Sequence, residues 1–347
     1  MKILVVRFKQ IGDAILSAPV CSTLKKSFPE AQVDYVVYEH IAPLFENHKY
    51  IDNIISITKE EQKNIFKYIK KVKKITKNNY DIIIDIMSTP KSEVFTLLSQ
   101  KSEYRIGRSK KWRGYTYTHK IEEPEGNLTK VEKLLKMLKP LENKTNIIYD
   151  KNFSTYITSE EKEYMKDKMI DAGIDFSRPI FACSVSSRVP DKIYPLEKMK
   201  FIIDNVIKET NAQIIFFYSP AEKDFVIKAH KFMKNEKNIF SNIVTKSIKE
   251  LAMLISNCDM LFGNEGGPRH LAQSLNIPNF VIFRAPYKKI EWLPDENDFN
   301  QAVEANEFCD NITNFSAENI YSLIPPEFVL DKVLTMYDKI KSKTDAL

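Results

Sequence analysis

Two loops of the sequence hold side chains that could transfer a proton and bind an anion. In the first, the apolar residues 2–6 lead into Arg7, Gly12 and Asp13. We expect Gly12 to allow a tight turn and Asp13 to lie at the N-terminus of the helix that follows and reaches residue 28, where aspartate is a favoured cap. The same carboxylate could instead act as a general base. Position alone favours the cap.

The second loop contains three of the chain's eight glycines within five residues, namely Gly263, Gly266 and Gly267. It follows an apolar run and precedes a helical pattern over residues 268–275. Glycines let backbone N–H groups approach a ligand, and the start of a helix attracts anions such as a diphosphate. The spacing matches neither Walker A nor GxGxxG. On its own, an ordinary strand-to-helix turn is the simpler interpretation.

Basic residues are concentrated in the first part of the chain. Residues 1–150 contain 27 lysines and arginines against 18 aspartates and glutamates, whereas the remainder contains 25 against 28. Six lysines fall within residues 67–77, where apolar residues recur at helical spacing, and a solvated helix face explains them most simply. A second cluster, residues 105–113, is interleaved with glycine and aromatic residues and predicts a loop. An anionic partner and plain solvation fit that loop equally well.

Composition argues against several classes of protein. The four cysteines are scattered without a CxxC pair and the five histidines form no HExxH motif, so neither a disulfide framework nor a zinc site is predicted. The sequence has no Asp-x-Asp motif, which favours chemistry without a metal, and we expect no cofactor. No recognisable nucleic-acid motif accompanies the basic residues. No apolar run approaches the length of a signal-peptide core or a membrane span, so we expect a cytoplasmic protein.

Apolar runs typical of buried parallel strands alternate with helical patterns along the chain. The predicted strands cover residues 2–6, 33–38, 81–86, 179–185, 213–218, 259–262 and 279–283. This alternation predicts an α/β protein with two doubly wound, parallel-sheet domains. We expect one domain over residues 1–155, a second over residues 156–324, and a terminal helix within residues 325–347 that packs back on the first domain.

The predicted architecture indicates where ligands bind. In open parallel sheets they bind beyond the carboxyl ends of the strands, where loops lead into helices. Facing loops of two such domains would border one cleft. The loops concerned are residues 7–15, 87–92, 184–192, 219–224 and 263–270.

Motifs at these loops resemble those of glycosyltransferase family nine, the heptosyltransferase family. Residues 7–19 follow the pattern R-x-x-x-x-G-D-x-x-x-x-x-P, and residues 80–85 with Lys91-Ser92 resemble the family's Tyr-Asp strand and the basic-Ser pair after it. Residues 192–195 match Lys-x-Trp-Pro with tyrosine in place of tryptophan. Glu222 falls where the family places a nucleoside-contacting glutamate, and residues 265–272 resemble D-[ST]-G-P-x-H-L-A. The resemblance covers most of the chain, in order.

The resemblance implies two Rossmann-like domains facing a cleft, the GT-B arrangement, with the acceptor on the N-terminal domain and the nucleotide sugar on the C-terminal one. It implies that Asp13 is the base in an inverting, metal-independent transfer of heptose from ADP-heptose. The implied donor-binding residues are Ser186, Ser187, Lys192, Glu222, Glu265, Gly266, Gly267 and His270. The acceptor-binding candidates are Gly12, Lys91, Arg105, Arg108 and Arg113.

Three of the donor-binding residues also have purely structural interpretations. Lys192 could be a solvent-facing lysine, although its Tyr-Pro neighbours favour a role in neutralising the departing diphosphate. Glu222 could equally be an acid of a first helical turn, and His270 a packed histidine at a helix start.

The departures from the family pattern concern the donor. Glu265-Gly266 stands where the family has aspartate followed by serine or threonine, which lengthens a carboxylate arm and removes a hydroxyl. The donor sugar is therefore open. The basic residues 105–113 are compatible with an anionic glycolipid or glycan acceptor, such as a lipopolysaccharide core, and with peripheral contact at the inner membrane surface. Two alternatives remain, a non-hydrolysing sugar-nucleotide epimerase, which needs no acceptor, and a catalytically idle relative that binds a sugar nucleotide.

Overall fold

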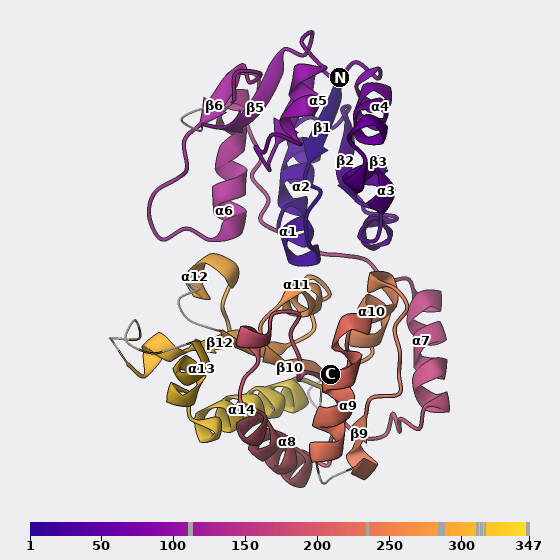
Figure 1. Cartoon of the computed structure of the whole chain (residues 1–347), viewed down its shortest axis with the longest axis vertical. Helices are drawn as coiled ribbons and strands as arrows, with labels where there is room; N and C mark the ends of the chain where they lie inside the picture. Colours follow the sequence, from indigo (N-terminus) through magenta and orange to yellow (C-terminus); the bar gives the residue numbers. More distant parts are fainter. Residues whose placement is uncertain are drawn as a thin grey trace. The chain divides into compact units, whose positions relative to one another are not determined.

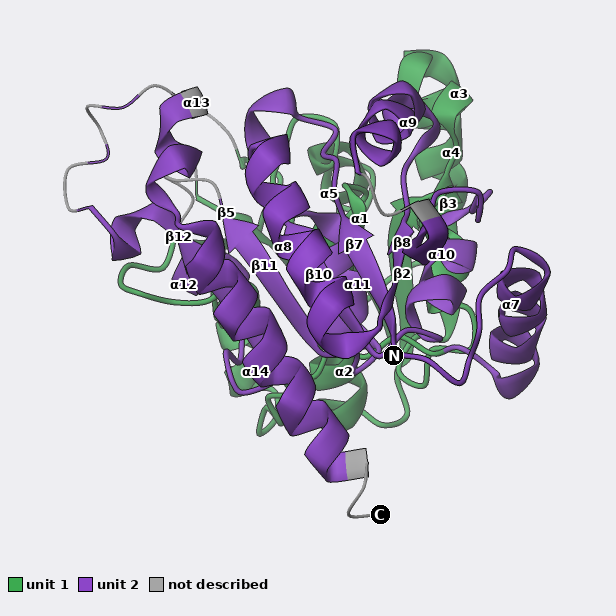
Figure 2. Cartoon of the chain, turned by 90° about the horizontal axis from the view of Figure 1, so that it is seen from below, with its two compact units in different colours: residues 1–156 green, residues 157–347 purple. Residues whose placement is uncertain are grey.

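The computed structural model of the chain describes residues 1–109, 114–233, 236–283, 289–309, 312, 315 and 317–344. It forms two compact units, Met1–Tyr156 and Ile157–Leu347 (Figures 1 and 2). The change of unit falls in a polar stretch without regular structure, between η2 (Lys136–Asn143) and α7 (Ser159–Asp171). Each unit is built around one parallel sheet, in agreement with the predicted fold class.

The sheet of the first unit has the strand order β3-β2-β1-β4-β5-β6, and all its strands are parallel. Its strands are β1 (Lys2–Val6), β2 (Gln32–Tyr38), β3 (Asn53–Ile57), β4 (Ile82–Asp85), β5 (Tyr104–Arg108) and β6 (His119–Ile121). The central strands β1 and β4 are buried along almost their whole length, because helices cover both faces.

The helices of the first unit fall on two sides of this sheet. They are α1 (Ile11–Ile15), α2 (Ala18–Ser27), α3 (Lys59–Lys63), α4 (Ile65–Thr76), α5 (Glu93–Leu97) and α6 (Lys130–Leu135), with the 3-10 turn η1 (Ala42–Phe45). Tyr68 and Val72 of α4 and Phe95 of α5 are buried in one apolar cluster with β1. On the other side, α2 contacts both β2 and α6.

The single helix predicted from Asp13 to residue 28 is divided into α1 and α2. Pro19 lies in the first turn of α2, and Ser17 is the N-cap of that helix. Proline has no backbone N–H, and its ring clashes with the carbonyl four residues earlier in a continuous helix. The chain therefore stops one helix at Ile15 and starts another at Ala18.

The sheet of the second unit has the strand order β12-β11-β10-β7-β8-β9 and is also parallel throughout. Its strands are β7 (Ile180–Ser184), β8 (Gln213–Phe216), β9 (Ile239–Phe240), β10 (Met260–Asn264), β11 (Asn279–Phe283) and β12 (Asn300–Glu304). The other elements are α8 (Leu196–Thr210), α9 (Lys223–Phe232), α10 (Ile248–Ile255), α11 (Gly267–Ser274), α12 (Lys289–Trp292), α13 (Ala317–Ile320), α14 (Pro326–Thr344), η3 (Pro190–Lys192), η4 (Pro220–Glu222), η5 (Glu236–Asn238), η6 (Ala305–Glu307) and η8 (Tyr321–Leu323).

The terminal helix α14 completes the core of the second unit. Val329, Val333 and Met336 are buried in the same apolar cluster as α8 and the strands β7, β8 and β10. Figure 2 shows α8 and α14 on the same side of this sheet, and the two helices contact each other. The sequence pattern predicted that this helix would pack back on the first domain. Its buried apolar side chains cover the sheet of its own unit, and packing on the first domain stays a prediction.

The strands missed from the sequence are those with mixed or short apolar patterns. β3, β6, β9 and β12 are the four sheet edges, where fewer side chains are buried. β5 was predicted as part of a basic loop, but Arg105 and Arg108 lie on this strand. Between them, Gly107 leaves room for the ring of Tyr117, because a Cβ atom there would lie 2.3 Å from a ring carbon.

Gly263 provides a direct test of how tightly β10 and β7 pack. Its φ angle is +117°, and a Cβ atom would lie 2.6 Å from the carbonyl oxygen of Ser184. We expect Gly263→Ala to lower the free energy of unfolding by about 3–5 kcal/mol, because backbone overlap adds to the strain of a positive φ. Gly126→Ala is the matched control, with φ +94° and nothing within 4 Å. It should cost only about 1–2 kcal/mol in urea unfolding, and equal losses in both variants would contradict the prediction.

Candidate active site

The carboxyl ends of three neighbouring strands form the candidate donor site of the second unit. β10, β7 and β8 are adjacent and parallel, so their carboxyl ends lie at one edge of the sheet. Two contacts join the loops that leave this edge. The Ser186 hydroxyl donates to Oε1 of Glu222 over 3.1 Å, and the Lys192 ammonium forms an ion pair with Glu265. The structure thus brings together four of the predicted donor-binding residues.

The Lys192–Glu265 ion pair lies at the start of α11. The two side chains keep 22% and 12% of their surface exposed. Gly266 is the N-cap of α11, and the first N–H groups of a helix have no acceptor within it. An ammonium group and helix-terminal amides side by side suit a phosphate group. Both side chains are mostly buried, so an anionic ligand that took the place of Glu265 would have to keep the charge of Lys192 compensated.

Glu222 and Ser187 are held by local hydrogen bonds. Glu222 accepts from the Ser219 amide over 3.0 Å and from the Ser219 hydroxyl, which completes a capping box at η4. The structure therefore shows the first-turn role that the sequence left open, and a nucleoside contact stays a prediction. The Ser187 hydroxyl accepts from the Val189 amide over 3.4 Å.

His270 is packed against a buried arginine that sequence reasoning missed. Arg269 is almost fully buried, and burial lowers its pKa to about 9. Its Nη2 donates to Nδ1 of His270 over 2.7 Å and to the Trp292 carbonyl, while Nη1 donates to Gln273 over 2.9 Å. Burial, and then the charge of Arg269, lower the pKa of His270 well below its ordinary value. The sequence signal that could have revealed Arg269 is a cation in the first turn of a helix, where the helix dipole disfavours positive charge.

In the first unit, Asp13 forms an ion pair with the arginine that follows β1. Arg7 is 4% exposed, and its Nη2 donates to Oδ1 of Asp13 over 2.5 Å. The Lys9 ammonium lies 3.5 Å from the same oxygen. Burial lowers the pKa of Arg7, and the charge of Asp13 opposes that shift. Oδ2 of Asp13 receives no hydrogen bond from the described residues and remains available to a ligand.

Asp13 lies near the N-terminus of its helix, as predicted, whereas Gly12 does not make the predicted turn. Gln10 is the N-cap of α1, and Asp13 is the third residue of that helix, in its first turn. Gly12 is buried inside α1 and is not among the glycines with positive φ, so no tight turn depends on it. Residues 8–10 make the turn from β1 into α1. Acceptor binding by Gly12 stays a prediction.

A buried carboxylate at the end of β4 organises the neighbouring loop. Asp85 accepts from the amides of Met87 (3.0 Å) and Ser88 (2.9 Å) and from the Tyr117 hydroxyl (2.7 Å). Burial raises the pKa of Asp85 to about 6, and these hydrogen bonds oppose the shift. The Ser88 hydroxyl in turn accepts from the Arg108 amide over 2.8 Å. The sequence marked Asp85 only as part of a family strand, and its partner Tyr117 lies far away in the chain.

Arg108 and Arg7 each keep an unused donor at this edge of the sheet. Nη1 of Arg108 donates to Glu123 over 2.7 Å, whereas its Nη2 is buried without a partner in the described part of the chain. Nε of Arg7 is likewise buried without a hydrogen-bond partner among the described residues. The positive charge of Arg108 also lowers the pKa of Arg7, which means that the two guanidinium groups repel each other. A buried and a partly buried cation, each with a buried spare donor, provide an environment suited to an anion.

Comparison with known proteins assigns the chain to a family. The model of glycosyltransferase family 9 (heptosyltransferase) matches residues 68–306. The chain belongs to this family. It is 25% identical over 297 residues to lipopolysaccharide heptosyltransferase 1 of Campylobacter coli, covering 82% of this chain and 84% of the relative. This membership decides among the alternatives left open by the sequence in favour of the glycosyltransferase.

Solved structures of family 9 show the same fold. A glycosyl transferase family 9 structure from Veillonella parvula superposes with a TM-score of 0.80 at 19% identity, covering 96% of both chains. The Escherichia coli heptosyltransferase WaaC with ADP-2-deoxy-2-fluoro heptose superposes with a TM-score of 0.66 at 16% identity, covering 96% of this chain and 99% of that one. Both confirm the predicted GT-B type of fold. In the described ranges of this chain, no helix is long and apolar enough to cross a membrane.

The remaining predicted acceptor residues make contacts within the first unit. Arg105 donates to the carbonyls of Thr116 (2.7 Å), Gln100 (2.8 Å) and Ser102 (2.9 Å). The Lys91 ammonium donates to the Gln62 carbonyl over 2.7 Å and lies 5.1 Å from the centre of the Tyr68 ring. These contacts tie loops to their own unit, and acceptor binding by either residue stays a prediction. Arg113 lies outside the described residues.

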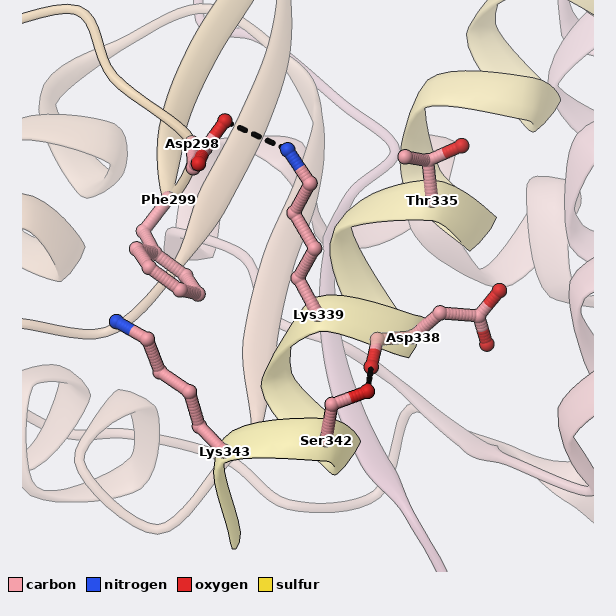
Figure 3. A pocket seen from close by; sticks show the side chains of 7 residues that line it. All are labelled: Asp298, Phe299, Thr335, Asp338, Lys339, Ser342 and Lys343. Carbon is pink, nitrogen blue, oxygen red and sulfur yellow. Dashed lines mark hydrogen bonds and ion pairs between the residues drawn. The ribbon is translucent and has the colours of Figure 1, made fainter. Parts of the chain in front are cut away.

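Two further features of the described residues do not point to another site. No group of three histidine, cysteine, aspartate or glutamate side chains there is arranged to hold a metal ion. A pocket of about 450 Å³ opens between α14 and the segment before β12 (Figure 3). The ion pair between Lys339 and Asp298 (2.6 Å) and the contact of Lys343 with the Phe299 ring engage its polar groups. It lies at the amino end of β12, opposite to the edge where ligands of parallel sheets bind.

The raised pKa of Asp85 predicts a pH-dependent stability. Its native pKa of about 6 lies above the ordinary value of 3.8, so its favourable contribution is complete below about pH 4 and is lost as the pH rises through 6. The loss amounts to roughly 3 kcal/mol. In urea unfolding, the wild type should therefore become less stable relative to Asp85→Asn between about pH 4 and pH 8. A difference that does not change with pH would contradict this account.

Proposed function

We propose that this glycosyltransferase moves heptose from ADP-heptose to a lipopolysaccharide core or a related anionic glycan. The relative from Campylobacter coli is named for lipopolysaccharide heptosyl transfer, and the Escherichia coli structure contains an ADP-heptose analogue. The observation that carries the proposal is the pairing of two features in one chain. One is the carboxylate of Asp13 with an open oxygen, and the other is the cationic, amide-rich edge around Lys192.

The second unit would bind the donor at the carboxyl edge of its sheet. Lys192 and the amides of Gly266 and Gly267 would neutralise the charge that develops on the leaving diphosphate, which would make a metal unnecessary. The Ser186 hydroxyl and the Glu222 carboxylate, which already contact each other, would both face the donor. In the free protein Lys192 is paired with Glu265, so this glutamate would compete with the phosphates of the donor. This glutamate and the adjacent Gly266 would also shape the space for the sugar.

In the first unit, Asp13 would remove the proton from the acceptor hydroxyl. Arg7 holds Oδ1, which orients the carboxylate and leaves Oδ2 to receive the proton. Once deprotonated, the acceptor oxygen would attack the anomeric carbon in a single displacement, and the bond to the diphosphate would break as the new glycosidic bond forms. Such a displacement inverts the anomeric configuration.

The acceptor would bear an anionic group. Arg7 contacts the proposed base and has a buried spare donor, and Arg108, which has another, raises the positive potential around Arg7. A phosphate or carboxylate of the acceptor would satisfy both donors and fix the hydroxyl near Asp13. An acceptor carried by a lipid would require work at the cytoplasmic face of a membrane, in peripheral contact with it.

Replacing the base tests the reaction directly. Asp13→Asn retains an oxygen for Arg7 but cannot accept a proton, so turnover should fall about 10²- to 10⁴-fold while ADP binding is unchanged. Nucleoside diphosphate release with ADP-heptose and extracted lipopolysaccharide core measures this. Asp171→Asn, in the exposed last turn of α7, is the matched control and should keep wild-type turnover. Equal turnover of Asp13→Asn and wild type would refute the assignment.

The ion pair at α11 predicts opposite effects of its two members on nucleotide binding. Lys192→Gln removes a charged donor and should weaken ADP binding about 10- to 100-fold. Glu265→Gln removes a negative charge beside Lys192 and weakens this contact, so ADP should bind more tightly. Isothermal titration with ADP measures both, and Lys200→Gln, which breaks an ion pair within α8, should change nothing. Weaker binding by Glu265→Gln would show that the glutamate does not compete with the phosphates.

A further inference from the structure

Helix α4 exposes an aromatic side chain on the face opposite to its core. Tyr68, Val72 and Ile75 are buried against the sheet. Phe66 points away from them and is 82% exposed, more than any other phenylalanine in the described residues, and its neighbour Ile65 is 55% exposed. Phe66 belongs to the apolar residues that recur at helical spacing in this segment, yet its side chain is not part of the core.

A stripe of lysines continues from Phe66 along this face. Positions four, seven and eleven residues after a helical residue lie on the same side of the helix. These positions are Lys70, Lys73 and Lys77, and all three are exposed. We call Phe66 and these three lysines the α4 face. Figure 1 shows α4 next to α3 in the first unit.

The acidic residues of this region do not neutralise the α4 face. Residues 59–77 contain eight lysines and two glutamates. Both glutamates, Glu60 and Glu61 of α3, pair with other lysines, Lys67 and Lys71. Lys70, Lys73 and Lys77 form no ion pair with any residue that the structure describes. The face therefore presents uncompensated positive charge beside an exposed aromatic ring.

We propose that the α4 face docks on an anionic phospholipid bilayer, with Phe66 inserted among the headgroups. Each lysine near a negatively charged membrane surface strengthens binding about fivefold. An aromatic ring gains from a partner with an apolar layer beneath its charged surface, which a bilayer offers and a nucleic acid backbone does not. The docking would bring the enzyme to the lipid-borne acceptor of the proposed function, and it involves none of the residues assigned to that reaction.

Vesicle binding by the full-length protein tests the proposal. The probe is sedimentation with vesicles of phosphatidylglycerol and phosphatidylcholine, compared with phosphatidylcholine alone. We expect binding only to the anionic vesicles, and release at high salt, which screens exposed charges. The variant K70Q/K73Q/K77Q should bind roughly 100-fold more weakly, and Phe66→Ser about tenfold more weakly. The controls lie on α9: K223Q/K228Q/K231Q removes the same number of exposed charges, and Phe232→Ser removes a ring that is 40% exposed.

The controls decide between a specific face and overall charge. Equal loss in both lysine variants, or unchanged binding of Phe66→Ser, would overturn the proposal. So would tighter binding of the wild type to single-stranded RNA than to anionic vesicles. Turnover on a soluble, delipidated core acceptor should be unchanged in the α4 variants. A protein that transfers no sugar but binds vesicles through the α4 face would refute the proposed function and leave the docking surface intact.

Discussion

The burial of the Arg7 guanidinium constrains the whole carboxyl edge of the first sheet. A cation removed from water must be compensated by an anion, and Asp13 supplies it from the first turn of α1. For this to happen, the chain must turn from β1 directly into a helix. The same pairing fixes one carboxylate oxygen and leaves the other open. A structural requirement of the fold and the orientation of the proposed base are thus met by one interaction.

The second unit has a different requirement, because in the proposed function Lys192 would pair first with Glu265 and then with the donor. Its rigid part is the contact of β10 with β7, where Gly263 lies against the Ser184 backbone, and the hydrogen bond from the Tyr194 amide to Asn264 (2.8 Å). On this frame, Lys192 and Glu265 form an ion pair, which a diphosphate would replace in the proposed function. The family's shorter aspartate at position 265 would reach Lys192 less easily. In the proposed function, the donor would therefore bind against a competing carboxylate of this chain.

The sequence predicted the central strands and the loops at their ends because both follow from simple rules. β1, β4, β7 and β10 are buried on both faces, and only apolar runs satisfy that condition. Parallel strands bring their carboxyl ends together, and this rule alone predicted that Ser186, Glu222 and Glu265 would lie at one edge of a sheet. The edge strands and β5 were missed because half-exposed strands tolerate charged residues such as Arg105 and Arg108.

Pairings between distant residues could not be predicted from the sequence. The hydrogen bond from Tyr117 to Asp85 depends on the space that Gly107 leaves for the tyrosine ring. The hydrogen bond from Arg269 to the Trp292 carbonyl depends on the packing of α12 against α11. Even over short range, the ion pair of Asp13 with Arg7 depends on the turn at residues 8–10.

The central claim is that a carboxylate held by Arg7 activates the acceptor for one displacement at the donor sugar. The most direct measurement is the anomeric configuration of the product formed from ADP-heptose, determined by nuclear magnetic resonance before any later rearrangement. A single displacement predicts that the product has the configuration opposite to that of the donor. A product with the donor's configuration would require two displacements or a different mechanism, and would contradict the account.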